Sequence, residues 1–239
     1  MFLMKIINNL YNGTSVKYTL LEAIAYLIII VFALTIHEYG HAFVAFRCGD
    51  STAKNAGRLS LNPLAHIDIT GMLLFLIAGF GYAKPVPINP SNFKNYRKGI
   101  TAVSLAGVIC NIFLGLLSLL LLFLYFTFLT RFTLFSNSFG LFLYDLIYYG
   151  VYINFILALF NLLPIYPLDG FRVLDVYLPY GNKFSQFMYR YGNRVLLGLI
   201  IFSIVAERLS SYSMIFSYLN IFNWFYALIN QLIALIPIM

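Results

Sequence analysis

The residue types best suited to chemistry in this chain are two histidines and a glutamate in the segment His37-Glu38-Tyr39-Gly40-His41. Residues four apart lie one above the other on a helix face, so His37 and His41 can hold one metal ion. Glu38 follows the first histidine directly and can act as a general base toward a water on that metal. Zinc suits such a site because it lowers the pKa of a bound water to about 7. The spacing therefore predicts a hydrolytic site with one Zn²⁺ per chain.

The surroundings of this segment favour the metal interpretation. The segment lies in an apolar run from about Leu20 to Phe46, and the whole chain contains only three histidines. Ionisable residues inside a membrane span are costly, so they are rare and usually functional. The structural alternative is a buried polar network that joins helices, and three ionisable residues within five positions fit that alternative poorly.

One ligand is still missing, because a catalytic zinc usually takes three protein ligands and leaves a fourth position for water. His66 lies in a polar connector, where a histidine that is solvated or caps a loop is the more common case. Asp169 follows the end of an apolar helix, and two prolines and a glycine hold the backbone around it off-helix. Residue chemistry therefore favours Asp169 as the third ligand, with Asp175 and Asp145 as alternatives.

The composition indicates a membrane protein. The chain of 239 residues is 62% apolar and 10% charged, whereas soluble domains carry about a quarter charged residues. The runs from Ile100 to Thr130 and from Tyr212 to Met239 contain no charged residue, and each exceeds the ~20 residues that cross a bilayer. The net charge of +7 does not indicate nucleic-acid binding, because the basic residues are spread through the connectors.

The long apolar segments predict the fold class, an all-α polytopic membrane protein with five to six transmembrane helices. The catalytic membrane core is expected over residues 20–170. It follows an N-terminal interfacial segment, 1–19, and precedes C-terminal transmembrane helices in 171–239. The predicted helices are approximately Leu20–Phe46, Ile100–Thr130, Leu141–Leu163, Tyr191–Ala206 and Tyr212–Ile236.

The apolar stretch from Ile69 to Tyr82 is too short to cross the bilayer and is framed by glycines. We predict a re-entrant, β-hairpin-like loop beside the active site, because non-helical backbone at membrane depth must be buried in protein or line a watery cavity. An edge strand at Gly79, Gly81 and Tyr82 could pair with an unwound substrate as an added strand. A simple loop is the alternative.

The basic residues also predict an orientation. The connector from Arg47 to Lys98 carries seven lysines and arginines, whereas the turn after the second predicted helix carries only Arg131. Since cytoplasmic loops are enriched in basic residues, we expect this connector and the active site on the cytoplasmic side and the N-terminus outside. The predicted localisation is the cell membrane, which the chain crosses several times.

With five motifs in order, the chain resembles the site-2 protease family of intramembrane zinc metalloproteases, in its compact form without a PDZ domain. The motifs cover about Leu20 to Gly170, and the last helices carry none. The matching segments are His37–His41, Gly57–Pro63 with His66–Asp68, Gly79–Val86, Ala106–Asn111 and Asn161–Gly170, the last of which reads NxxPxxPLDG.

The resemblance implies roles for particular residues. Asp169 aligns with the family's third zinc ligand, and Asn111 aligns with an asparagine that holds substrate or the developing oxyanion near the metal. The alternative for Asn111 is an interhelical hydrogen bond. Val108 stands where the family usually has proline, so the placement of Asn111 is the point that a structure has to test.

The expected activity is hydrolysis of peptide bonds within or near transmembrane helices of single-span membrane proteins, with those substrates and the lipid bilayer as partners. One alternative is a zinc-binding transporter, which would repeat its metal sites in related halves, and no repeat is visible. Another is an inactive protease-like scaffold, which would lack a ligand or the base. His37, Glu38, His41 and Asp169 are all present. The sequence assigns neither the substrate nor the oligomeric state.

Overall fold

Three long helices form the centre of the molecule. The computed structural model describes residues 2–78, 81–128, 137–209 and 219–236. Among these residues, α2 (Val16–Arg47), α5 (Tyr96–Thr127) and α6 (Ser138–Asn161) are long and apolar enough to cross a membrane. At 1.5 Å per residue α2 is about 48 Å long, more than the ~30 Å hydrocarbon core. The bounds agree with the first three predicted helices to within a few residues.

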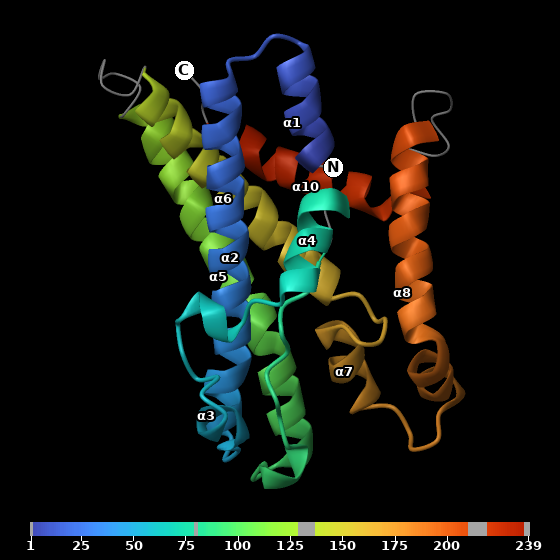
Figure 1. Ribbon diagram of the computed structural model, residues 1–239. Helices are drawn as coiled ribbons and strands as arrows, with labels where there is room; N and C mark the ends of the chain where they lie inside the picture. Colours follow the sequence, from blue (N-terminus) through green and yellow to red (C-terminus); the bar gives the residue numbers. More distant parts are fainter. Residues whose placement is uncertain (1, 79–80, 129–136, 210–218, 237–239) are drawn as a thin grey trace.

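The other helices lie around these three (Figure 1). The predicted fourth and fifth helices correspond to α8 and α10, but neither is among the described helices that are long and apolar enough to span. The predicted number of five to six spans is therefore not confirmed. The remaining helices are α1 (Phe2–Tyr11), α3 (Thr52–Asn55), α4 (Ile69–Ala78), α7 (Asp169–Asp175), α8 (Lys183–Leu209) and α10 (Ile221–Ala234), with single 3₁₀ turns at Pro63–Ala65 and Pro90–Asn92.

Small residues allow the three long helices to approach closely, as is common in membrane bundles. A methyl group on Gly40 of α2 would lie 3.2 Å from the Ala106 carbonyl oxygen of α5. A methyl group on Gly150 of α6 would lie 2.6 Å from the Ser118 hydroxyl of α5. In consequence, polar side chains on α2, α5 and α6 can reach one another inside the bundle.

The segment predicted as a β-hairpin-like loop has a different form in the described residues. Ile69 to Ala78 is the helix α4, and Gly79 lies outside the described residues. Gly81 and Tyr82 begin an extended stretch that continues to Asn89 and contains no assigned strand. The β-hairpin is therefore not confirmed. The chain does fold back on itself, because a methyl group on Gly71 of α4 would lie only 1.9 Å from the Tyr82 carbonyl oxygen.

Two buried charged side chains fix this extended stretch against the end of α2. The guanidinium of Arg58 donates hydrogen bonds to the carbonyl oxygens of Ala65, Lys84 and Pro85. The carboxylate of Asp50, just past α2, accepts from the backbone N–H of Asn89 at 2.7 Å and from the Asn92 side-chain amide at 2.8 Å. The side chains of both Arg58 and Asp50 are buried. The extended stretch is thus held at both ends.

Candidate metal centre

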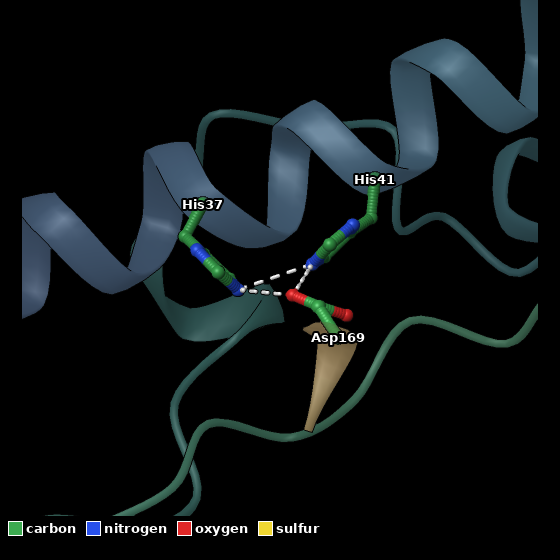
Figure 2. Close-up of side chains that lie close together, drawn as sticks. All are labelled: His37, His41 and Asp169. Atoms are coloured by element: carbon green, nitrogen blue, oxygen red, sulfur yellow. Dashed lines mark hydrogen bonds and ion pairs between the residues drawn. The ribbon is translucent and has the colours of Figure 1, made fainter. Parts of the chain in front are cut away.

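His37, His41 and Asp169 meet inside the bundle (Figure 2). The two imidazoles project from the same face of α2, and their Nε2 atoms are 3.1 Å apart. Oδ2 of Asp169, the first residue of α7, lies 3.4 Å from Nε2 of His37 and 3.2 Å from Nε2 of His41. All three residues are buried, each with 6% of its surface exposed. The structure therefore brings together the two predicted histidine ligands and the favoured third ligand.

The end of α6 determines where Asp169 lies. Pro164 and Pro167 follow α6 and cannot continue it, so the chain turns back before α7 begins. Gly170 makes the turn tight, since a methyl group there would lie 2.2 Å from the Leu162 carbonyl oxygen. Burial raises the pKa of Asp169, whereas positive charge at the two histidines, His41 foremost, lowers that pKa well below its usual range, so a cation at this position keeps the carboxyl group ionised. Asp169 is thus an ionised carboxylate aimed at the histidines.

Hydrogen bonds to α5 fix the tautomer of both histidines. Nδ1 of His37 lies 2.6 Å from Oδ1 of Asn111, and Nδ1 of His41 lies 2.7 Å from the Val103 carbonyl oxygen. Both partners are oxygens that only accept, so each Nδ1 carries the ring proton. Each Nε2 therefore presents a lone pair toward Asp169. This arrangement is typical of metal-binding histidines, whose second nitrogen donates to a neighbouring group.

The resulting donor set fits a zinc ion. Two imidazole lone pairs and a carboxylate oxygen face one another at 3.1 to 3.4 Å, and Oδ2 of Asp169 is buried without a hydrogen-bond donor in the described part of the chain. Three such atoms repel each other unless a cation or a proton lies between them. Two nitrogens and one oxygen are ligands that zinc accepts, and three protein ligands are usual for a catalytic zinc.

The face of α5 beneath the histidines is shaped to accommodate the rings. Val103, Gly107 and Asn111 are four residues apart and so share one helix face. A methyl group on Gly107 would lie 2.6 Å from Cε1 of His37 and 2.6 Å from Nε2 of His41. Only glycine leaves room for both rings at this position. The metal centre is therefore built by α2, α5 and the start of α7 together.

A cavity of about 120 Å³ opens beside the three ligands. Glu38 lies on its wall, and Oε2 of Glu38 accepts a hydrogen bond of 3.1 Å from the backbone N–H of Val86 in the extended stretch. The cavity thus has walls from α2, from the extended stretch, from the end of α6 and from the start of α7. Its lining residues are His37, Glu38, His41, Pro85, Val86, Ile88, Asn161, Pro167, Leu168, Asp169 and Arg172.

The other residues that the sequence singled out are distributed as follows. Asn111 is fully buried behind His37 and does not line the cavity, and its substrate-binding role stays a prediction. Gly81 and Tyr82 lie outside the lining, which uses residues 85, 86 and 88 instead. His66 is buried and its Nε2 lies 2.8 Å from the Ser60 carbonyl oxygen, consistent with the loop-capping role.

The alternative third ligands lie elsewhere. Asp145 is buried in α6, and Asp175 accepts a hydrogen bond of 2.6 Å from the Tyr189 hydroxyl. Neither belongs to the group of potential metal ligands in the described residues.

Two polar residues of the cavity wall had no role assigned from the sequence. Arg172 follows Asp169 by three residues on a helix, a spacing that places both side chains on one face of α7. That spacing is a signal the sequence contained. Asn161 heads the NxxPxxPLDG segment, and its side-chain amide donates to the Leu157 carbonyl oxygen at 2.9 Å. Its position at the last residue of α6 brings it to the wall.

Two histidines four apart on a helix, a glutamate after the first and a third ligand from a distant segment are typical of zinc metalloproteases. Because helices of membrane length carry that arrangement here, the fold and the site define a membrane metalloprotease. The chain belongs to peptidase family M50, the site-2 proteases, whose family model matches residues 25–203.

Individual relatives agree with this assignment. The chain is 41% identical to YwhC of Bacillus subtilis over 167 residues, which cover 70% of this chain and 75% of YwhC. It is 29% identical to Rip2 of Mycolicibacterium smegmatis over 151 residues, 61% of this chain and 54% of Rip2. Rip2 of Mycobacterium tuberculosis is 30% identical over 152 residues, with the same coverage. All three are named as zinc metalloproteases, and no solved structure matches the chain.

Proposed function

We propose that this zinc metalloprotease hydrolyses peptide bonds within or near the transmembrane helices of single-span membrane proteins. The observation that carries the proposal is that His37 and His41 lie within α2, a helix of membrane length, and that Asp169 reaches them from the start of α7. His37 lies ten residues before Arg47, the last residue of α2. At 1.5 Å per residue the site is therefore about 15 Å from that end of the helix. A site near one end of a helix of membrane length favours a substrate chain that itself enters the membrane.

The size of the cavity favours an unwound substrate. A volume of about 120 Å³ is small beside an α-helix, which with its side chains is about 10–12 Å across. A helix also conceals its peptide groups in its own hydrogen bonds. A substrate helix must therefore open locally before one of its peptide bonds reaches Glu38 and the metal ligands.

His37, His41 and Asp169 would hold the zinc, which when bound polarises a carbonyl group and acidifies water. Glu38 removes the proton from the attacking water and later passes it to the leaving amine. The N–H of Val86 holds one oxygen of the Glu38 carboxylate. The other oxygen, Oε1, makes no hydrogen bond within the described part of the chain and is free to accept the proton.

Arg172 is the cationic residue on the cavity wall, and its side chain is exposed. No ion pair links it to an acidic residue in the described part of the chain. We infer that its guanidinium donates hydrogen bonds to the substrate carbonyl oxygen, where negative charge develops during attack. Asp169 and Arg172 would then act from one face of α7, one as a ligand and the other as a donor.

The extended stretch limits where substrate can pair with it. The Lys84 N–H donates to the His66 carbonyl at 2.8 Å, and the Val86 N–H donates to Glu38. Pro85 and Pro87 have no N–H to donate. Residues 84–87 therefore offer no free N–H to an added strand, and we propose Gly81 to Ala83 as the edge, with the N–H of Ile88 as a further candidate donor. Gly79 lies outside the described residues.

We propose that the site faces the cytoplasm. The connector from Arg47 to Lys98 joins the C-terminal end of α2 to the N-terminal end of α5, and these are the ends nearest the metal ligands. Figure 1 shows α3, the start of α5 and α7 at this same end of the molecule. Seven lysines and arginines in that connector support a cytoplasmic location.

Replacing Glu38 by glutamine tests the proposed function, because glutamine keeps the shape and loses the base. Wild type and Glu38→Gln would be purified, reconstituted in lipid nanodiscs and incubated with labelled single-span proteins, and the cuts mapped by mass spectrometry. We expect cuts within or beside the span, a fall in kcat of about 10²–10⁴-fold for the variant, and unchanged zinc content. The matched control is Glu22→Gln, a buried acid of α2 bonded to Tyr149 away from the cavity.

Undiminished cleavage by Glu38→Gln would contradict the role of the base. Wild-type enzyme that cuts soluble peptides but no single-span protein of the panel would contradict the proposed substrate class. A Glu22→Gln variant that loses as much activity as Glu38→Gln would show that the effect is not specific to the cavity.

A further inference from the structure

We propose that Asn154 of α6 is a positioning residue of the metal centre, which holds the Asn111 amide in the one orientation that keeps His37 able to bind metal. Asn154 touches neither the cavity nor the three ligands, so the inference rests on a chain of hydrogen bonds. It also rests on the proposed use of His37 as a zinc ligand.

The chain of hydrogen bonds crosses three helices. The Asn154 side-chain amide donates to the Gly150 carbonyl oxygen at 2.8 Å, one turn earlier in α6. Oδ1 of Asn154 then accepts from Nδ2 of Asn111 at 3.0 Å, and Oδ1 of Asn111 lies 2.6 Å from Nδ1 of His37. Asn111 is 0% exposed and Asn154 is 3% exposed, so water does not replace these partners.

The direction of this series of hydrogen bonds is fixed at its Gly150 end. The Gly150 carbonyl only accepts, so the nitrogen of the Asn154 amide must face it and the oxygen must face Asn111. The Asn111 amide therefore turns its nitrogen toward Asn154 and its oxygen toward His37. The proton of His37 is thereby held on Nδ1, and its Nε2 keeps a free lone pair for the metal.

A flipped Asn111 amide would reverse the outcome at His37. Its nitrogen would face Nδ1, which would then have to accept, and the ring proton would move to Nε2, where it blocks coordination. Besides Asn154, Nδ2 of Asn111 contacts the Ala33 carbonyl oxygen at 3.4 Å, near the limit of a hydrogen bond. That weak contact is a poor substitute, so the orientation depends on Asn154.

The test measures zinc affinity, which does not require a substrate. Asn154→Leu removes the acceptor at similar volume, and we expect 10–100-fold weaker zinc binding in competition with a chromogenic chelator. The d–d absorption of the Co²⁺-loaded variant should change as well. Asn154→Asp should keep affinity within a few-fold, because a buried carboxyl is held neutral and can donate to Gly150 while accepting from Asn111.

A double-mutant cycle separates this role from a general loss of packing. If Asn154 acts through Asn111, Asn154→Leu weakens zinc binding in the wild-type background and adds nothing in an Asn111→Leu background. Tyr149→Phe is the matched control, because it removes a buried polar contact of α6 to Glu22 that does not reach the metal centre. It should leave zinc affinity unchanged.

Unchanged zinc affinity and an unchanged Co²⁺ spectrum in Asn154→Leu would overturn the proposal, as would equal losses in the two backgrounds. Equal losses in Asn154→Leu and Asn154→Asp would overturn it too. If Asn154→Leu does not fold, Asn154→Ala takes its place, and the same 10–100-fold loss of zinc affinity is expected of it. Because cleavage is not measured, a failure here leaves the proposed proteolytic function to its own test.

Discussion

Replacing Gly107 by alanine should disable the metal centre while leaving the bundle folded. Gly107 lies on α5 directly beneath the imidazoles of His37 and His41. The change adds one methyl group, and it adds that group where both rings already lie against the backbone. No charged or catalytic group is altered, so the effect reports on geometry alone.

The size of the effect follows from three distances. The new Cβ would lie 2.6 Å from Cε1 of His37, 2.7 Å from Nδ1 of His37 and 2.6 Å from Nε2 of His41. Contacts between carbon atoms become favourable near 3.5 Å, so each ring must move by roughly 0.9 Å. Metal–ligand distances tolerate deviations of only about 0.2 Å. A misplacement near 1 Å costs about 100-fold in rate, and we expect at least that loss of cleavage.

Folding should suffer much less than metal binding. Alanine is favoured over glycine in a helix interior by about 1 kcal/mol, whereas overpacking costs about 1–3 kcal/mol. The metal-free variant should therefore be destabilised by no more than about 2 kcal/mol.

The assay compares zinc affinity by chelator competition, thermal unfolding of the metal-free protein and cleavage. Gly198→Ala in α8 is the control, because a methyl group there meets nothing within 4 Å. Wild-type zinc affinity and cleavage in Gly107→Ala would refute the reasoning, since it would mean that the rings do not bind metal where the structure places them.

Two further predictions concern the cavity wall and the buried carboxylate that holds the end of the extended stretch. Arg172→Gln should lower kcat by about 100-fold with unchanged zinc affinity, measured against Arg190→Gln as a control outside the cavity. Asp50→Ala should destabilise the protein by roughly 2–4 kcal/mol in thermal unfolding and expose the connector to limited proteolysis, because buried donors lose their acceptor. Burial raises the pKa of Asp50, but hydrogen bonds, led by those from Thr52, lower that pKa overall. The contribution of Asp50 to the free energy of unfolding is therefore present at neutral pH and is lost only in acid, as the pH falls through the lowered pKa.

The sequence predicted those parts of the structure that depend on local patterns. The bounds of the three long helices followed from uncharged apolar length, and α2 was predicted as Leu20–Phe46 and observed as Val16–Arg47. The His37 and His41 pair followed from helical spacing. Asp169 followed from the prolines that end α6, with the family resemblance deciding among three candidate aspartates.

The remainder depends on contacts between distant segments, which spacing does not encode. The role of Gly107 is visible only when α5 lies across α2. The series of hydrogen bonds that connects Asn154 to His37 exists only when three helices pack together. The helix α4 within the expected hairpin was missed because ten apolar residues fit a short helix as well as a strand. The predicted number of five to six spans stays unconfirmed, because α8 contains charged residues along its length and α10 has only 14 residues.

The distribution of the metal centre along the chain has a consequence for biosynthesis. His37 and His41 are made early, whereas Asp169 is added 132 residues after His37, once α5 and α6 have been synthesised. At typical translation rates that interval is on the order of ten seconds. A ribosome-bound intermediate that exposes only α2 and α5 lacks a ligand and is inert. The set of three metal ligands is therefore complete only after α5 and α6 have been made and the start of α7 has come to lie against α2.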